Sequence, residues 1–350
     1  MKKPIIIIFA VILAIHLLGL GLFMAFRGGG KEEEPPSPET PSGFEKDTPP
    51  EPTLLPPESG SGRAPVKRRA TPRMNRVGTP KFSFDGAAGK ISGLPFTGKA
   101  GILVDLDSGK VLWASNANKS VPIASMTKMM TALLAFEDIR AGKVSMDSEV
   151  KVSKKASAIG GSDIWLDPRE SFKLRDLLKA MLIKSANDAA YQVAEYLGGS
   201  GGVAGFVKRM NSKASELGMK HTRFHNPHGL PETPSSNDNA AACRDLVVLA
   251  ALLSRFPEVL EMTSTRMVYI SRGVGKNKKT QLVNTNNLVR RGVPGVDGMK
   301  TGYTRHAGSC LTATCRRGGR RLIAVVAGFK HASDRDVFVR KLLDWGYKRK

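Results

Sequence analysis

The sequence predicts an α+β domain in which an antiparallel sheet is packed with helices. Strand-like runs occur at residues 100–115 and again at 308–329, near the two ends of the region 91–350. Helix-forming, amphipathic segments fill most of the sequence between them. Bringing the two strand-rich ends together would close one sheet and leave helices on its faces.

Each element of this domain follows from a local pattern. Two strands are predicted around the turn Asp107-Ser-Gly109, and the runs 308–314 and 321–329 predict a hairpin about Arg317-Gly-Gly319. Apolar residues at helical spacing predict the remaining elements. The predicted helices start at Ser125, span 171–197 as a pair with a turn between them, and continue at 206–217, 243–253 and 333–345.

The N-terminal segment is predicted to lie outside this domain. Two lysines precede an uncharged, mostly apolar run from Pro4 to Phe26, which is long enough to span a bilayer. We therefore expect residues 1–27 to form a transmembrane signal-anchor with its N-terminus in the cytoplasm. The alternative is a cleaved signal peptide, whose apolar region is typically about 7–15 residues long.

Residues 28–90 are rich in proline and poor in large apolar side chains, which predicts a disordered linker. The folded domain is then 91–350, exported to the outer side of the cytoplasmic membrane. The net charge of the chain is +23. Since no nucleic-acid-binding motif accompanies this charge, we expect an acidic wall or membrane surface, and not DNA or RNA, as the basic domain's environment.

The three cysteines are Cys243, Cys310 and Cys315. An odd number excludes complete intramolecular pairing. Cys310 and Cys315 are five residues apart in a predicted strand, so their side chains should face opposite sides of the sheet. We expect buried free thiols and no disulfide between them.

Three short motifs carry candidate chemistry. Ser125 and Lys128 lie three residues apart at a helix start, so both point to one face. A serine hydroxyl needs a base to become a nucleophile, and a buried lysine loses its proton more easily because desolvation disfavours the ammonium. The same Ser-x-x-Lys pattern at Ser148 lies in a strand-like run and is interpreted as a chance match.

Two further motifs follow in order: Ser185-Ala-Asn187, and Lys300-Thr-Gly302, which occurs once. A second Ser-x-Asn match, at Ser235, lies in a polar loop. Ser-x-x-Lys, Ser-x-Asn and Lys-Thr-Gly together are the signature of penicillin-recognising serine enzymes.

The segments around these motifs, together with Phe224-His-Asn-Pro-His-Gly-Leu-Pro231, resemble the D-alanyl-D-alanine carboxypeptidase family, the low-molecular-mass penicillin-binding proteins. The resemblance covers about residues 90–350. It implies the serine β-lactamase/transpeptidase-like fold, peptidoglycan stem peptides as substrate and β-lactams as covalent inhibitors. No cofactor or metal is implied.

The resemblance also implies roles for the motif residues. Ser125 is the nucleophile, Lys128 the base, and Ser185 passes a proton to the departing D-alanine. The implied substrate-binding residues are Asn187, Lys300, Thr301, Gly302, Tyr303 and Arg335, with the backbone N–H groups of Ser125 and Tyr303 forming the oxyanion hole. For Ser185 and Asn187 the alternative is helix capping, and for Arg335 it is a solvated charge beside Asp334 and Asp336.

Three other functions are weighed. A zinc site at His221, His225 and His228 is disfavoured because Pro227 predicts a loop and not a helix. A β-lactamase would need a water-activating carboxylate beyond Ser-x-Asn, whereas Asp163, Asp167 and Glu170 precede it. A non-catalytic wall-binding protein would not need Ser125 or Lys128.

Overall fold

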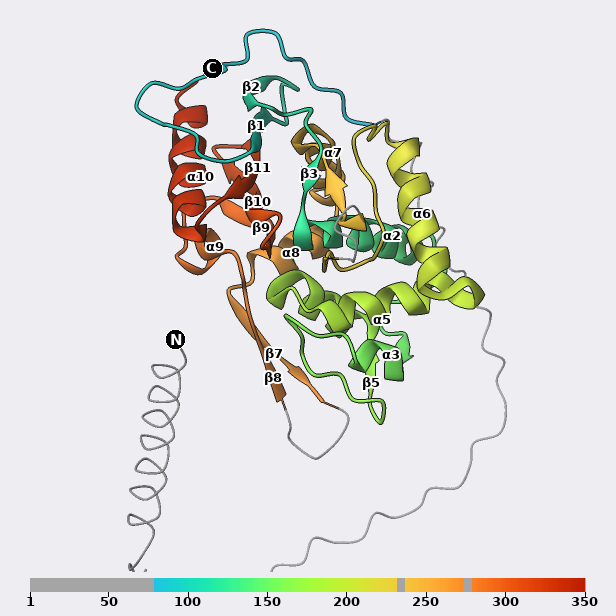
Figure 1. Ribbon diagram of the computed structural model, residues 1–350. Coiled ribbons are helices and arrows are strands. Elements are labelled where there is room, and N and C mark those ends of the chain that lie inside the picture. The colour runs from blue at the N-terminus through green and yellow to red at the C-terminus, as the bar shows by residue number, and fades with distance from the viewer. Residues whose placement is uncertain (1–78, 232–236, 273–278, 350) are drawn as a thin grey trace, which may run out of the picture. The chain divides into compact units, whose positions relative to one another are not determined.

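The computed structural model describes residues 79–231, 237–272 and 279–349 (Figure 1). The predicted signal-anchor at 1–27 and the greater part of the predicted linker lie outside these residues. Among the described ranges, no helix is both long and apolar enough to cross a membrane.

Residues 79–90 differ from the prediction of a disordered linker. The N–H of Ser83 donates to Gly109 O at 2.9 Å, and the N–H of Ala88 donates to Leu112 O at 3.0 Å. Phe82 is partly buried against the core. The predicted boundary at residue 90 therefore lies too late, because a few apolar side chains and backbone hydrogen bonds tie this segment to the domain.

A five-stranded antiparallel sheet organises the domain, in the order β2-β1-β11-β10-β9. The strands are β1 (Ala100–Asp105), β2 (Val111–Ser115), β9 (Val296–Thr304), β10 (Gly308–Arg317) and β11 (Arg320–Phe329). Pairing of β1 with β11 places Ile102 opposite Val325. The predicted closure of the sheet by the two ends of the domain is thus confirmed.

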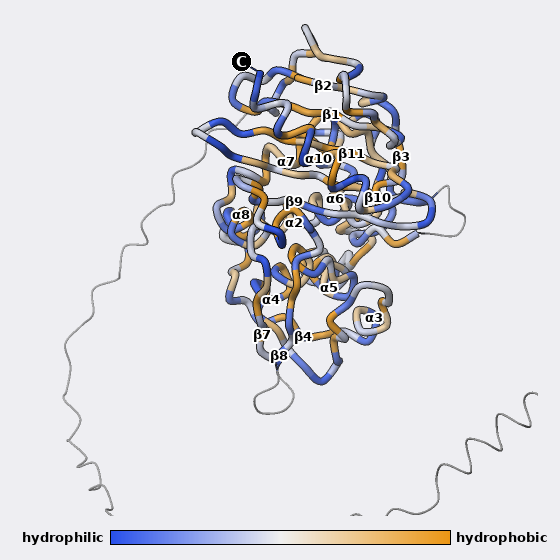
Figure 2. Tube along the Cα trace, turned by 90° about the vertical axis from the view of Figure 1, so that its left-hand side faces the viewer, coloured by the Kyte–Doolittle hydropathy of each residue, from blue (hydrophilic) through white to orange (hydrophobic). Residues whose placement is uncertain are grey.

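Helices cover both faces of this sheet (Figure 1). Helix α10 (Ala332–Tyr347) packs on one face, where Phe338 and Trp113 belong to the smaller core cluster. The larger cluster lies on the other face and includes residues of α2 (Lys128–Arg140), α5 (Asn187–Gly198) and α7 (Cys243–Leu253). Because both faces are covered, β11 is apolar along almost all of residues 322–329, and Figure 2 shows β1 and β11 as largely hydrophobic.

The predicted orientation of the cysteines is confirmed. Cys310 belongs to the larger core cluster and Cys315 to the smaller one, on opposite faces of β10. Both are buried free thiols, as is Cys243. Burial raises the pKa of the Cys310 thiol to about 11.

The remaining elements are short strands and helices, apart from the longer helix at residues 202–216. Three two-stranded sheets pair β3 (Val121–Pro122) with β6 (Ala240–Ala241), β4 (Glu149–Lys151) with β5 (Ser171–Lys173), and β7 (Met267–Ser271) with β8 (Lys279–Val283). The other helices are α3 (Lys154–Ser157), α4 (Leu174–Lys179), α6 (Gly202–Glu216), α8 (Pro257–Ser264) and α9 (Asn287–Arg290).

Sequence reasoning missed the β7–β8 hairpin and helix α8. In the hairpin only Ile270 and Leu282 are buried, so the run shows little of the apolar alternation that predicts strands. The helices at 243–253 and near 333–345, and four of the five strands of the central sheet, were predicted within a few residues of their bounds, whereas β9 was not among the predicted elements.

Candidate active site

Ser125 lies in a tight turn that runs directly into helix α2. Residues Ala124–Thr127 form a 3₁₀ turn, and α2 begins at Lys128. Ala124 has a positive φ of 48°, and the hydroxyl of Thr127 donates to Ala124 O at 2.8 Å. This geometry presents Ser125 on the same side as Lys128, whose Nζ lies 2.8 Å from Ser125 Oγ.

The Lys128 side chain is fully buried and meets three oxygens. Besides Ser125 Oγ, its Nζ donates to Asn187 Oδ1 at 2.7 Å and to His228 O at 2.6 Å. Burial, and then the charge of Lys300, hold the pKa of Lys128 well below its usual value. A neutral amine has two N–H donors and one lone pair. The two donors match the carbonyl oxygens of Asn187 and His228, which leaves the lone pair for the proton of Ser125.

The loop that supplies the His228 carbonyl is held by Asn226. Asn226 Oδ1 accepts from the N–H groups of His228 and Gly229, at 3.2 and 2.7 Å. Gly229 has φ +86°, and a Cβ there would lie 2.0 Å from Ala124 O. Sequence reasoning noticed this segment but assigned it no role. Its Asn-Pro-His-Gly composition signalled a tight loop, and only the fold shows that the loop reaches Lys128.

The Ser-x-Asn motif forms the turn between two helical segments, as predicted. A π-helical turn, Ala180–Lys184, ends at Ser185, which has φ +67°, and α5 starts at Asn187. Neither side chain caps a helix. Ser185 Oγ accepts from Lys300 Nζ at 2.8 Å, and Asn187 is bonded to Lys128 and, through Nδ2, to Gly160 O at 2.9 Å. The capping alternative is therefore wrong for this structure.

Lys300 lies on β9 and is almost fully buried. Its Nζ donates to Ser185 Oγ and to Thr301 O, the latter at 3.0 Å. Burial, and then the nearby charge of Arg335, lower the pKa of Lys300 to about 7. This group is thus poised to gain or lose a proton near neutral pH.

Gly302 lets strand β9 approach the Ser125 turn. A Cβ at this position would lie 2.6 Å from Ile123 O and 3.3 Å from the N atom of Met126. Sequence reasoning assigned Gly302 to close approach of the substrate backbone. The structure adds a second requirement, since the protein's own backbone occupies that space.

A pocket of about 830 Å³ opens over these residues. Six of the predicted site residues line it: Ser125, Ser185, Thr301, Gly302, Tyr303 and Arg335. The other three, Lys128, Asn187 and Lys300, are buried behind this surface. Sequence reasoning did not identify several further lining residues, which come from four separate segments: Ser162, Lys184, Gln281, Val283, Asn284, Thr285, Asn287, Arg290 and Ala332.

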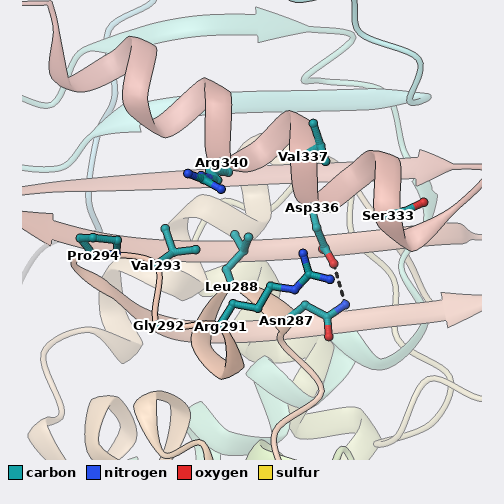
Figure 3. A pocket seen from close by; sticks show the side chains of 10 residues that line it. All are labelled: Asn287, Leu288, Arg291, Gly292, Val293, Pro294, Ser333, Asp336, Val337 and Arg340. Atoms are coloured by element: carbon teal, nitrogen blue, oxygen red, sulfur yellow. Dashed lines mark hydrogen bonds between the residues drawn. The ribbon is translucent and has the colours of Figure 1, made fainter.

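Arg335 is buried, so the solvated-charge alternative is wrong. Its Nε and Nη2 donate to Asp336 Oδ1 at 2.9 and 2.6 Å, and its Nη1 donates to Cys310 O at 3.0 Å. Asp336 Oδ2 accepts from Asn287 Nδ2 at 2.8 Å (Figure 3). Of the five guanidinium N–H donors, one on each terminal nitrogen remains, which suits a carboxylate.

Asn287 and Asp336 also line a neighbouring cavity of about 340 Å³ between α9 and α10, which Figure 3 shows. Leu288, Val293 and Pro294 are among its apolar lining residues. The Asn287–Asp336 contact therefore separates this cavity from the pocket that holds Ser125.

The side chains that the other weighed functions would need have other partners. His228 Nδ1 accepts from the N–H of Leu230 at 3.1 Å, and burial lowers the pKa of His228 to about 3. Glu170 pairs with Arg272, and Asp167 pairs with Arg169. Among the described residues that line the pocket, none is aspartate or glutamate.

Comparison with known proteins agrees with this geometry. A family model described as D-alanyl-D-alanine carboxypeptidase matches residues 91–331. The chain belongs to the D-alanyl-D-alanine carboxypeptidase family. The predicted family is thereby confirmed.

Two curated members of the D-alanyl-D-alanine carboxypeptidase family illustrate the extent of the match. The D-alanyl-D-alanine carboxypeptidase DacF of Bacillus subtilis is 40% identical over 74% of this chain and 64% of that protein. DacB2 of Mycobacterium tuberculosis is 31% identical over 70% of this chain and 81% of that protein. The chain thus spans somewhat less than two thirds of DacF.

Solved structures of the family share the fold. Penicillin-binding protein D2 from Listeria monocytogenes in its ampicillin-bound form is 33% identical, with a TM-score of 0.64 over 73% of this chain and all of that one. The D-alanyl-D-alanine carboxypeptidase from M. tuberculosis is 30% identical, with a TM-score of 0.66 over 75% of this chain and 96% of that one. The predicted fold class is confirmed.

Proposed function

We propose that this chain is a serine D-alanyl-D-alanine carboxypeptidase that removes the terminal D-alanine from peptidoglycan stem peptides. The observation that carries this proposal is the buried Lys128 amine, 2.8 Å from Ser125 Oγ, with its two other partners both acceptors. That arrangement suits a neutral lysine that takes a serine proton. Family membership supports the same reaction and substrate.

In the acylation step, Ser125 Oγ attacks the carbonyl between the two D-alanines while Lys128 takes the hydroxyl proton. A positioned general base contributes roughly 10²–10⁴-fold in rate. The backbone N–H groups of Ser125 and Tyr303 would stabilise the oxyanion, and each such donor is typically worth roughly 10²–10³-fold. The two free donors of Arg335, together with Thr301, bind the terminal carboxylate.

The second lysine–serine pair serves the leaving group. As the C–N bond breaks, Ser185 donates its proton to the departing amine and takes one from Lys300. D-alanine then leaves and water attacks the acyl carbonyl, giving a proton through Ser185 to Lys300. When the acyl–oxygen bond breaks, Lys128 returns its proton to Ser125. Both lysines are then restored, and no proton is left over.

The site of action follows from the substrate. Because peptidoglycan lies in the cell envelope, outside the cytoplasm, the enzyme acts there. The apolar run within 1–27 supports a single-pass anchor in the cytoplasmic membrane, and the proline-rich segment after it supports a tether to the domain. We propose this anchor on the sequence alone.

The test is the intact mass of the purified full-length chain after mixing with a penicillin, followed over time beside Ser125→Ala. We expect a long-lived adduct that the substitution abolishes, and then D-alanine release from a peptide ending in D-Ala-D-Ala. An adduct that clears within seconds would favour a β-lactamase. Absence of any adduct would contradict Ser125 as nucleophile and favour a wall-binding protein.

A further inference from the structure

Most of the large hydrophobic side chains that are exposed to solvent gather around the mouth of the Ser125 pocket. In the described part of the chain there are seven of them: Phe84, Trp165, Met267, Tyr269, Val283, Tyr303 and Val337. Two of these, Val283 and Tyr303, line the pocket directly. Three more, Met267, Tyr269 and Trp165, contact residues that line it. Exposed apolar groups concentrated in this way usually mark a binding surface.

The β7–β8 hairpin contributes most of this surface. Its register places Met267 opposite Val283 and Tyr269 opposite Gln281. Because side chains alternate along a strand, these four residues share one face, while Ile270 and Leu282 are buried on the other. Met267 is 49% exposed and Tyr269 53%. We call these four residues the hairpin face.

The hairpin face is continuous with the pocket wall. Gln281 and Val283 belong to the pocket lining. Gln281 Nε2 lies 3.0 Å from Tyr269 Oη and 2.7 Å from Met267 Sδ, so the amide ties the two exposed side chains to the rim. A ligand that extends out of the pocket on this side meets an apolar and aromatic surface carrying one amide.

Trp165 extends the same mouth from another segment. Its side chain is 72% exposed, and Lys184 Nζ lies 4.6 Å from the centre of its ring. Lys184 itself lines the pocket and donates to Asp163 O at 2.6 Å. Lys184 and Arg290 give this rim positive charge, and no described lining residue is acidic.

We propose that the hairpin face binds the part of the stem peptide that lies beyond its last three residues. The proposal rests on the proposed carboxypeptidase function and names a substrate-binding surface for it. Three extended residues span only about 10 Å, whereas the five residues of a stem pentapeptide span about 16 Å. A longer peptide therefore has to leave the pocket along its rim. Rigid aromatic groups contact a peptide at low entropic cost, and the cationic rim favours an acidic one.

The test compares two substrates that share the same third residue: a tripeptide ending in D-Ala-D-Ala and the complete stem pentapeptide. The variant is Met267→Ser with Tyr269→Ala, and the matched controls are Val337→Ala and Phe84→Ala, which remove exposed apolar side chains away from this mouth. We expect kcat/KM for the pentapeptide to fall about three- to tenfold in the hairpin variant, on the scale of lost aromatic contacts. The tripeptide, penicillin acylation and both controls should change less than about twofold.

Equal losses for both peptides, or no loss for either, would overturn the proposal. A disaccharide pentapeptide serves as a third substrate: a loss confined to it would assign the surface to the saccharide and refute the peptide. Pentapeptide binding to Ser125→Ala, with and without the hairpin substitutions, gives a second readout that needs no turnover. If the unsubstituted chain neither forms a penicillin adduct nor releases D-alanine, the proposed function itself has failed. If it does both and the hairpin variant behaves like the controls, only this inference has failed.

Discussion

The side-chain nitrogen of Lys300 lies 2.8 Å from the hydroxyl oxygen of Ser185, across 115 residues of sequence. The contact joins two of the three motifs, and it repeats the Lys128–Ser125 pair, which has the same separation of 2.8 Å. Both lysines are buried, and the charge of Lys300 further lowers the pKa of Lys128. Two lysine–serine pairs with depressed lysine pKa values therefore share one site, one for each proton transfer of the proposed reaction.

Lys300 should impose a pH limit on turnover. Its pKa of about 7 means that the free enzyme loses the Lys300 proton as pH rises through neutrality. The leaving group needs that proton, so kcat/KM for a D-Ala-D-Ala peptide should fall above about pH 7. Arginine stays charged throughout this pH range, so Lys300→Arg should abolish the fall in kcat/KM above pH 7, although its overall activity should be lower. If kcat/KM of the variant falls above pH 7 as it does in the unsubstituted chain, Lys300 is not the group that titrates.

Lys128→Met should separate catalysis from stability. Penicillin acylation should fall by roughly 10²-fold or more, because the base is lost. The melting temperature should change much less than the rate, since removing a buried amine offsets the loss of the hydrogen bonds to Asn187 Oδ1 and His228 O. Lys155→Met, at an exposed position, is the control. Parallel loss of folding and acylation would argue against a base role.

The same substitution should change how stability depends on pH. The folded-state pKa of Lys128 lies well below 10.5, its unfolded value. Between these two values the unfolded chain holds a proton that the folded chain does not, so the free energy of unfolding rises with pH. Lys128→Met removes this contribution. Unfolding by denaturant across the alkaline range should therefore show a shallower rise for Lys128→Met than for the unsubstituted chain.

Asp336 should act on substrate binding through Arg335. Asp336→Asn removes the carboxylate that accepts from Arg335 Nε and Nη2. A hydrogen bond to a charged group is worth about 1.5–3 kcal/mol, so KM for a D-Ala-D-Ala peptide should rise roughly tenfold or more, with a smaller change in kcat. The uncompensated charge of Arg335 should also lower the pKa of Lys300 further, so that kcat/KM begins to fall at a lower pH. Asp334→Asn, on the same helix but exposed, is the matched control.

Gly302→Ala should disturb the Ser125 turn. The added Cβ would lie 2.6 Å from Ile123 O, so β9 and the turn have to separate. Overpacking of this kind typically costs about 1–3 kcal/mol of stability, and penicillin acylation should fall more than tenfold. Gly201→Ala, where nothing lies within 4 Å of the added Cβ, should change neither. Normal acylation by Gly302→Ala would show that this close approach is not needed.

The sequence by itself determined the parts of this protein that depend on local pattern. Three motifs identified Ser125, Ser185 and Lys300 as members of one site, and their order indicated one family. The apolar runs at 100–115 and 308–329 indicated that the ends of the domain share a sheet. Such features are readable because strand, helix and turn signals act over a few residues.

Only the tertiary structure decided what those side chains touch. It placed the His228 carbonyl against Lys128, directed both ends of the Asn187 amide to protein partners, and buried Arg335 against Asp336. None of these contacts has a local signal, because each joins segments brought together by packing of the whole domain or fixes a side chain by burial. The lowered pKa values of the two lysines have the same origin, since desolvation is a property of the folded core and not of the sequence around each lysine.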